Sequence, residues 1–323
     1  MNQIIHHLKN SNNLFLATHA NPDGDAIGSL IAMGLSLEAL NKRTTLYNES
    51  PIPAVYRFLP FADRIVQYVD KANIYDTAII LDCSDLERIG KAVSMVNKIP
   101  IIINIDHHIT NTCFGDFQLI KTSACATTEI LHKLMKDLAV PINKAIAASI
   151  YTGILTDTGS FRFSNTNRAA FKICEEMVEL GVDPYSIAQH VYGTYSLDRI
   201  KLLNMALDSI EISYNGQLSM MTLTRDMFYE TDTRAEDADG LINYAKSIEN
   251  VKVAVLIQEL QNKNKQFHVS LRSNGTVNVA EIASSFGGGG HANAAGFSIE
   301  STLSDLKSQI FKLADKMCNI YAM

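Results

Sequence analysis

Clusters of carboxylate and imidazole side chains recur in the first half of the chain. In chain order they contribute His19, Asp23, Asp25, Asp82, Asp106, His107, His108 and Asp157. Neighbouring carboxylates without a basic partner repel one another and resist ionising, and a bound divalent cation removes that conflict. The donor set is nitrogen and oxygen without sulfur, which suits Mn²⁺, with Mg²⁺, Co²⁺ and Fe²⁺ as alternatives. These residue types therefore predict a metal centre.

The number of candidate ligands exceeds what one closed tetrahedral site holds. We expect two ions that share one carboxylate, held by His19, Asp23, Asp25, Asp82, His107 and Asp157. Two ions about 3.5–4 Å apart can clamp the attacking and leaving oxygens of a phosphoryl displacement and activate a bridging water. For the first cluster taken alone, the alternative is a turn in which Asp23 or Asp25 only caps the next helix.

The clusters follow apolar segments that could place them along one edge of a sheet. Strands are predicted over 14–17, 77–81 and 100–105, and helices over 26–40, 125–137, 143–156 and 168–180. The strand segments are almost continuously apolar, which is typical of parallel strands buried on both faces. Side chains at the carboxyl ends of such strands face the crevice where ligands bind. We expect an α/β fold with a doubly wound, mostly parallel sheet over residues 1–190.

A different pattern follows this catalytic domain. Residues 191–209 are predicted to form a helical linker, and residues 210–323 a smaller α+β domain that binds substrate. Asn215-Gly216 is a strong hairpin signal between two short apolar runs. Further strands are predicted over 251–260 and 266–272, and helices over 278–286 and 303–320. We expect the active site in the cleft between the two domains.

Four consecutive glycines separate the predicted helix over 278–286 from a histidine. Such a run lets the backbone approach a phosphate closely, and successive N–H groups can form an anion-binding nest. We expect a built loop there rather than a flexible linker. Arg272 could clamp a phosphate through two hydrogen bonds, the alternative being a solvated charge at a strand end. The predicted substrate-binding residues are Arg162, Arg272, Gly288, Gly289, Gly290 and His291.

Composition narrows the class of substrate. The chain has 323 residues with 28 Lys and Arg against 34 Asp and Glu, a formal net charge of −6. A protein that tracks long nucleic acid normally carries a basic footprint, so this balance argues against a long polyanion. The five cysteines are scattered without C-x-x-C spacing, and no uninterrupted apolar stretch is long enough for a membrane span. We expect a cytoplasmic protein without a membrane segment or signal peptide.

Five segments resemble the motifs of a known family. HANPDGDAIGS, LDCSD, IDHH and TDTGSFRFSN resemble the four motifs of the DHH phosphoesterase superfamily, and GGGGHANAAGF resembles the glycine-rich motif of its DHHA1 domain. The order and spacing of these motifs are kept over nearly the whole chain. In length and domain content the chain is similar to the stand-alone bifunctional oligoribonuclease (nanoRNase) and pAp-phosphatase group.

The resemblance implies a role for each motif residue. One metal would be held by His19, Asp23 and Asp82, and the other by Asp25, Asp82, His107 and Asp157, so that Asp82 bridges the two ions. With Asp82, the other catalytic residues would be His108, which would face the substrate phosphate, and Asp106, which would orient a histidine. The family's arginine and glycine-loop histidine match Arg272 and His291 and would bind the nucleotide phosphate.

The expected activity is Mn²⁺-dependent hydrolysis of short oligoribonucleotides to 5′-mononucleotides, removal of the 3′-phosphate of 3′-phosphoadenosine 5′-phosphate (pAp), or both. Turnover of cyclic di-AMP or pApA is an alternative that the motifs do not separate. An exopolyphosphatase is less expected, because pyrophosphatases of the superfamily resemble a different C-terminal domain that lacks GGGGH. A RecJ-like exonuclease is also less expected, because it would need a longer and more basic chain. The intact ligand set argues against a nucleotide sensor without catalysis. The expected partner is a short oligonucleotide or mononucleotide substrate. The sequence leaves open whether the chain forms a homodimer.

Overall fold

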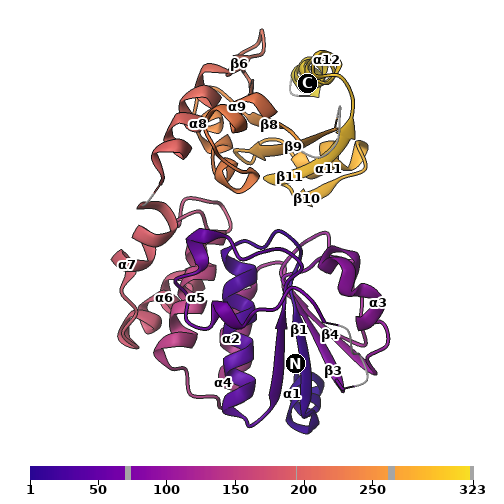
Figure 1. The fold of residues 1–323 in the computed structure, drawn as a ribbon. Helices are drawn as coiled ribbons and strands as arrows, with labels where there is room; N and C mark the ends of the chain where they lie inside the picture. Colours follow the sequence, from indigo (N-terminus) through magenta and orange to yellow (C-terminus); the bar gives the residue numbers. More distant parts are fainter. Residues whose placement is uncertain (70–73, 194, 261–265, 321–323) are drawn as a thin grey trace. The chain divides into compact units, whose positions relative to one another are not determined.

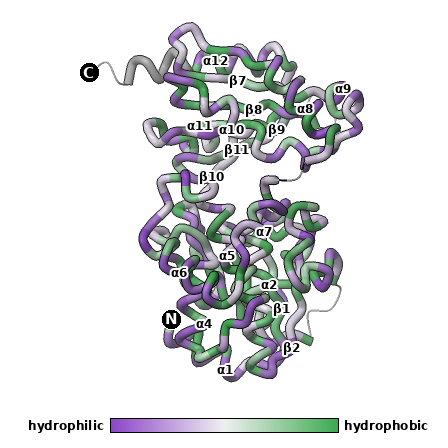
Figure 2. Tube along the Cα trace, turned by 90° about the vertical axis from the view of Figure 1, so that its left-hand side faces the viewer, coloured by the Kyte–Doolittle hydropathy of each residue, from purple (hydrophilic) through white to green (hydrophobic). Residues whose placement is uncertain are grey.

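The computed structural model describes residues 1–69, 74–193, 195–260 and 266–320, and it divides into two compact units, Met1–Thr194 and Tyr195–Met323 (Figure 1). Each unit is built around its own sheet. In both units the hydrophobic residues, green in Figure 2, concentrate in the strands and in the helices that cover them. No helix within the described ranges is long and apolar enough to cross a membrane.

The first unit contains a parallel five-stranded sheet with the order β2-β1-β3-β4-β5. Its strands are β1 (Asn13–Ala17), β2 (Arg43–Tyr47), β3 (Thr77–Leu81), β4 (Ile101–Asp106) and β5 (Phe117–Ile120). In the sheet register Ala17 pairs with Ile80, and Leu81 pairs with Ile105. The carboxyl ends of the three central strands therefore lie side by side, and the residues that follow them share one edge of the sheet.

Successive residues of each strand point to opposite sides of the sheet, so its apolar strands present two hydrophobic faces. Helices cover both of these faces. One face buries Leu16 and Ile79 under α1 (Asn2–Asn10), α2 (Gly24–Ala39), α4 (Thr127–Asp137), α5 (Lys144–Asp157) and α6 (Arg168–Glu179). The other face buries Phe15 and Ile80 under η3 (Leu86–Ala92) and α3 (Val93–Val96). The arrangement confirms the predicted α/β fold with a buried parallel sheet. Four short helices complete the unit: η1 (Ala54–Tyr56), η2 (Ala62–Arg64), α7 (Pro184–Ala188) and η4 (Gln189–Gly193).

Helices α2 and α5 approach so closely that two of their contact positions require glycine. A Cβ atom on Gly28 of α2 would lie 2.4 Å from the carbonyl oxygen of Ser149 in α5. A Cβ atom on Gly153 of α5 would lie 2.5 Å from Oγ1 of Thr128 and 2.7 Å from Oδ1 of Asp25. Favourable contacts between carbon atoms are normally about 3.5–4 Å long. The absence of these two side chains therefore lets Asp25 lie directly against α5.

The second unit contains a mixed six-stranded sheet with the order β10-β11-β9-β8-β7-β6, in which only the β7–β8 pair of the described strands is parallel. Its strands are β6 (Glu211–Ile212), β7 (Leu218–Leu223), β8 (Val253–Glu259), β9 (Gln266–Ser273), β10 (Gly289–His291) and β11 (Ala294–Glu300). Its helices are α8 (Leu197–Asp208), α9 (Arg225–Glu230), η5 (Ala235–Ala238), α10 (Ile242–Lys246), α11 (Val279–Ser285) and α12 (Leu303–Ile320). One face of the sheet packs on α11 and α12, and the other on α8 and α10.

The differences from the sequence prediction lie in short or polar segments. The sequence patterns do not predict α1, β2 or β5. The expected loop after the 278–286 helix is also wrong in part, because Gly289–His291 forms β10 and pairs with β11. A glycine run has no side chains to show the alternation of a strand, so its pairing is hidden in the sequence. The Asn215-Gly216 hairpin is confirmed, with Gly216 at a φ of 71°.

Candidate metal centre

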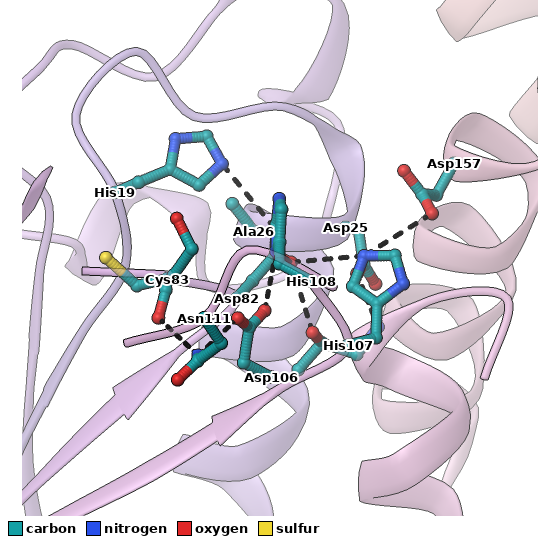
Figure 3. Close-up of polar contacts among 12 residues, drawn as sticks. His19, Asp25, Ala26, Asp82, Cys83, Asp106, His107, His108, Asn111 and Asp157 are labelled. Atoms are coloured by element: carbon teal, nitrogen blue, oxygen red, sulfur yellow. Dashed lines mark hydrogen bonds and ion pairs between the residues drawn. The ribbon is translucent and has the colours of Figure 1, made fainter. Parts of the chain in front are cut away.

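The candidate ligands lie where three neighbouring strands end. His19 comes two residues after β1, Asp82 directly follows β3, and His107 directly follows β4. Figure 3 shows these side chains converging from the sheet, with Asp157 approaching from the end of α5. The parallel sheet thus brings together clusters that are far apart in the sequence.

Asp82 is the central residue of this group. Its Oδ2 lies 3.5 Å from Nε2 of His19, and its Oδ1 lies 3.6 Å from Nε2 of His107 and 3.7 Å from Nδ1 of His108. The side chain is 2% exposed. Asp82 has a φ of 51°, a left-handed conformation that Asp adopts more readily than most residues, and its N–H donates to the carbonyl of Ile105. This turn directs the carboxylate of Asp82 into the group of histidines (Figure 3).

Two histidines present their Nε2 atoms to the carboxylates. Nδ1 of His19 lies 2.9 Å from the carbonyl oxygen of Ala20, and Nδ1 of His107 lies 3.3 Å from that of Ala124. A carbonyl oxygen only accepts hydrogen bonds, so each Nδ1 must carry its hydrogen. Each Nε2 can then act as a metal ligand, and a backbone carbonyl that fixes the ring is the usual support for such a ligand.

Several of the clustered carboxylates and imidazoles have shifted pKa values because they are buried together. Burial, and then the charge on Asp82, raise the pKa of Asp25 to about 7. Burial and the charge on Asp25 raise the pKa of Asp157 well above its usual range. Burial alone would lower the pKa of His107, but Asp157, Asp82 and Asp25 raise it to about 9. In the absence of metal the group therefore retains protons that a divalent cation would displace.

The pKa values of Asp82 and His19 are shifted in opposite directions. Burial would raise the pKa of Asp82, but the hydrogen bond with His19 and the nearby imidazole charges hold it well below its usual range. Burial would lower the pKa of His19, but the same hydrogen bond and the charges of Asp23 and Asp82 raise it. The central carboxylate is thus the one most strongly held in its charged form.

Two of the carboxylates also cap helices. Asp23 accepts hydrogen bonds from the backbone N–H groups of Asp25 and Ala26 through Oδ1, at 3.0 Å each, and so caps α2. Asp25 accepts from the N–H groups of Thr127 and Thr128, at 2.6 and 3.0 Å, and so caps α4 from outside that helix. The capping alternative for this cluster is therefore also correct. Capping uses only one oxygen of Asp23, so it does not exclude a metal.

The donor atoms fit a divalent metal centre. Three sets of possible ligand atoms each lie within 4.8 Å of one another: His19, Asp23 and Asp82; Asp25, Asp82 and His107; and Asp82, Asp106 and His108. Asp157 approaches the second set, with Oδ2 lying 3.6 Å from Nε2 of His107. Ligands placed about 2.1 Å from a common ion lie roughly 3–3.5 Å from each other. The contacts of Asp82 with His19 and His107, at 3.5 and 3.6 Å, are close to this spacing.

The structure places the predicted substrate-binding residues in both units. In the second unit Ala294 of β11 pairs with Arg272 on one side and with His291 on the other. Directly paired residues point to the same face of a sheet, so these two side chains share a face and their strands lie about 10 Å apart. In the first unit Arg162 follows α5, and its Nε donates to the carbonyl of Gly159 at 2.7 Å.

Two of the three predicted glycines are required by close contacts within the second unit. A Cβ atom on Gly288 would lie 2.2 Å from the carbonyl oxygen of Gly296, and one on Gly290 would lie 2.5 Å from that of Ala294. Gly290 also has a φ of 142°. A Cβ atom on Gly289 would have no neighbour within 4 Å. Packing therefore explains two of the three glycines, and open space beside Gly289 leaves room for a ligand.

Several polar residues behind the ligands were not predicted from the sequence. Asn165 donates to the backbone carbonyl and to Oδ2 of Asp157, at 3.0 and 3.2 Å. Asn111 donates to Oδ2 of Asp106 at 2.6 Å and to Oδ1 of Asn104 at 2.9 Å. The one signal in the sequence is Asn104, an amide in the otherwise apolar run of β4, which is fully buried.

Comparisons with known proteins agree with this geometry. Residues 13–154 match the DHH family, N-terminal domain, and residues 218–319 match the DHHA1 domain. The bifunctional oligoribonuclease and PAP phosphatase NrnA of Thermus thermophilus is 33% identical over 290 residues, which span 89% of this chain and 84% of that protein. The chain belongs to the DHH family. A protein of the same description from Bacillus subtilis is 28% identical to this DHH protein over 89% of its chain and 90% of the relative.

A solved structure extends the similarity of this DHH protein over both units. An exopolyphosphatase-related protein from Bacteroides fragilis superimposes with a TM-score of 0.90 and 26% identity, covering 98% of each chain. The DHH family consists of metal-dependent phosphoesterases, so the chain is a phosphoesterase, and its histidine and aspartate clusters could bind a metal.

Proposed function

We propose that this DHH phosphoesterase hydrolyses short oligoribonucleotides to 5′-mononucleotides and removes the 3′-phosphate of pAp. The relatives from Thermus thermophilus and Bacillus subtilis, which match over most of their length, are described as having both activities. The observation that carries the proposal is the position of the Asp82 carboxylate, whose two oxygens face His19 on one side and His107 on the other.

Two divalent ions, most suitably Mn²⁺, would share Asp82. His19 and Asp23 would complete one site, and Asp25, His107 and Asp157 the other. When bound, the ions would stabilise the charge of the phosphoryl group and activate the attacking water. The chain supplies a rigid cage: the Nδ1 atoms of His19 and His107 are held by backbone carbonyls, and Asp25 is held by the first turn of α4.

His108 would serve the leaving group. Its Nδ1 lies 2.6 Å from Oδ1 of Asp106, which is fully buried, so the ring is fixed, and Nε2 would face the substrate. A histidine held in this way can donate a proton to a departing oxygen or stabilise its charge. Asp106 would act behind His108, with its Oδ1 accepting from Nδ1 of His108 and its Oδ2 accepting from Asn111.

The second unit would bind the other end of the substrate. Arg272 offers paired N–H donors that suit a phosphate, and His291 lies on the same face across β11. The backbone around Gly288, Gly289 and Gly290 would approach the nucleotide closely. Arg162 would contact the phosphate beside the metal centre.

A substrate panel tests this proposal. The purified protein would be incubated with Mn²⁺ and, separately, with a 5′-phosphorylated diribonucleotide, pAp, pyrophosphate and cyclic di-AMP, and products would be separated by ion-exchange chromatography. We expect mononucleotide from the diribonucleotide and AMP from pAp, with pyrophosphate left intact. Failure to cleave either linear nucleotide contradicts the proposal, and turnover of cyclic di-AMP alone would favour a cyclic-dinucleotide phosphodiesterase.

A further inference from the structure

We propose that Asn111 is a positioning residue that fixes the tautomer of His108 and the backbone next to Asp82. The inference rests on the proposed function for the role of His108, but its structural part stands on hydrogen bonds alone. Asn111 lies in the loop after β4, behind Asp106, and Figure 3 shows its amide between Asp106 and the backbone of Cys83.

The orientation of the Asn111 amide follows from its partners. Oδ1 of Asn111 accepts a hydrogen bond from the backbone N–H of Cys113 at 2.7 Å, so the NH₂ group must point the other way. There it meets Oδ2 of Asp106 at 2.6 Å and Oδ1 of Asn104 at 2.9 Å. The two N–H bonds of the amide thus face three acceptors, the third being the backbone carbonyl of Cys83 at 3.3 Å.

Asn104 is fixed in the same manner. Its Nδ2 donates to the backbone carbonyls of Ile80 and Cys83, at 3.3 and 3.1 Å, so its Oδ1 must face Asn111. A flipped amide at either asparagine would set donor against donor or acceptor against acceptor inside the protein, which costs about 1–3 kcal/mol for each unsatisfied buried group. The chain of hydrogen bonds therefore has one direction, from Asn104 and Asn111 towards Asp106.

This direction determines what His108 presents to the substrate. The Asp106 carboxylate accepts hydrogen bonds at both oxygens, from Asn111 at Oδ2 and from Nδ1 of His108 at Oδ1. The hydrogen of a neutral His108 then resides on Nδ1, and the Nε2 lone pair points away from the network. Removing Asn111 leaves a buried carboxylate oxygen without its amide donor and allows Asp106 and His108 to reorient.

The same amides support the turn that carries Asp82. The carbonyl of Cys83 accepts from Asn104 at 3.1 Å and from Asn111 at 3.3 Å. Cys83 directly follows Asp82, whose backbone is left-handed with a φ of 51°. One small polar network thus links the carboxylate proposed to bridge the metals with the histidine proposed to serve the leaving group.

The test uses the full-length protein with Asn111→Ala and Asn111→Asp, and with Asn204→Ala as the matched control. Asn204 is exposed on α8, and its side chain makes only a 3.5 Å contact with Asp208 among the hydrogen bonds described. With Mn²⁺ and a 5′-phosphorylated diribonucleotide, we expect kcat to fall about 10–100-fold in both Asn111 variants while KM changes little, as for other residues that orient a site. The control should match the wild type.

Long-range ¹H–¹⁵N NMR of the imidazole rings in the metal-free protein gives a second readout that does not require turnover. With the His108 signals assigned by His108→Gln, we expect the wild-type ring, at a pH where it is neutral, to carry its hydrogen on Nδ1. Asn111→Asp should reduce that preference. A wild-type His108 protonated on Nε2 overturns the proposal, as do unchanged kcat and His108 signals in folded Asn111 variants. If the wild type cleaves no substrate in the panel, the proposed function fails, whereas the NMR result still decides the positioning role.

Discussion

Oδ1 of Asp25 lies 2.7 Å from the hydroxyl of Thr128, so a carboxylate of the candidate metal centre also holds the first turn of α4. The N-cap position of α4 is Ala126, which has no side-chain acceptor for the free N–H groups of that turn. Asp25 supplies the missing acceptor from α2. The same carboxylate therefore contributes to the stability of the fold and to the site.

Replacing Thr128 with valine should test this double role. Thr128→Val keeps the shape of the side chain and removes the hydroxyl that donates to Asp25, so we expect a loss of about 1.5–3 kcal/mol in the free energy of unfolding. Thr128→Ser keeps the hydroxyl and should lose only about 1 kcal/mol for the missing methyl group. Urea unfolding of the metal-free proteins measures both, and a valine variant as stable as the wild type would show that this hydrogen bond is unimportant.

Gly153→Ala should destabilise the protein although alanine is the better helix former. In an open helix the change would gain about 1 kcal/mol. Here the new methyl group would lie 2.5 Å from Oγ1 of Thr128 and 2.7 Å from Oδ1 of Asp25, and overpacking of this kind costs about 1–3 kcal/mol.

The control for this change is Ala145→Gly near the start of the same helix, which should lose about 1 kcal/mol by propensity alone. Thermal unfolding compares the two variants with the wild type. An increase in Tm for Gly153→Ala would mean that α5 and Asp25 are not packed as described.

The shifted pKa values predict how the stability of the metal-free protein depends on pH. The pKa of Asp25 is raised from 3.8 to about 7, so the folded state favours the neutral acid and this contribution weakens as pH rises from about 4 to 7. The pKa of His107 is raised from 6.5 to about 9, so its contribution is complete below its unfolded pKa and is lost as pH rises through about 9. Both shifts have the same sign, and Tm in EDTA should fall across this range.

Excess Mn²⁺ should oppose that fall. Metal binding requires deprotonated ligands, so the rise in Tm caused by Mn²⁺ should be larger at about pH 8.5 than at about pH 6. Parallel thermal melts in Mn²⁺ and in EDTA at each pH provide the comparison. A rise that is absent, or that is larger on the acidic side, would speak against a metal site made of these residues.

The sequence predicts that the candidate metal ligands come together, because three of them follow apolar strands of a parallel sheet whose carboxyl ends lie along one edge. His19, Asp82 and His107 could be placed on this basis alone. The residues that support these ligands through hydrogen bonds could not be placed from the sequence. Asn111 and Thr128 act through hydrogen bonds whose partners depend on loop geometry, and nothing in their local pattern distinguishes them from ordinary loop and cap residues.

The two units show the same contrast at the level of the fold. The long strands and helices were predictable because their apolar periods are clear. β5 and β10 were not, since four residues or a run of glycines carry too little side-chain pattern to reveal pairing. The register of β10 places His291 on the same face as Arg272, the two residues proposed to bind a substrate phosphate.

Asp82→Ala should remove both turnover and the stabilisation by metal. Loss of the shared carboxylate leaves His19 and His107 without their common partner, and we expect kcat to fall at least about 100-fold, the scale seen when a preorganised charge-stabilising group is removed. Asp137→Ala is the matched control, because Asp137 is exposed on α4 and pairs only with Lys133 among the contacts described. Activity near the wild-type level in Asp82→Ala would refute the central position of this residue.

Anomalous X-ray diffraction from crystals grown with Mn²⁺ tests the central claim most directly. We predict two manganese peaks that flank the carboxylate of Asp82, one contacting His19 and Asp23 and the other contacting Asp25, His107 and Asp157. A structure with no manganese peak beside Asp82 at saturating Mn²⁺, or with a single ion that this carboxylate does not contact, would contradict the account.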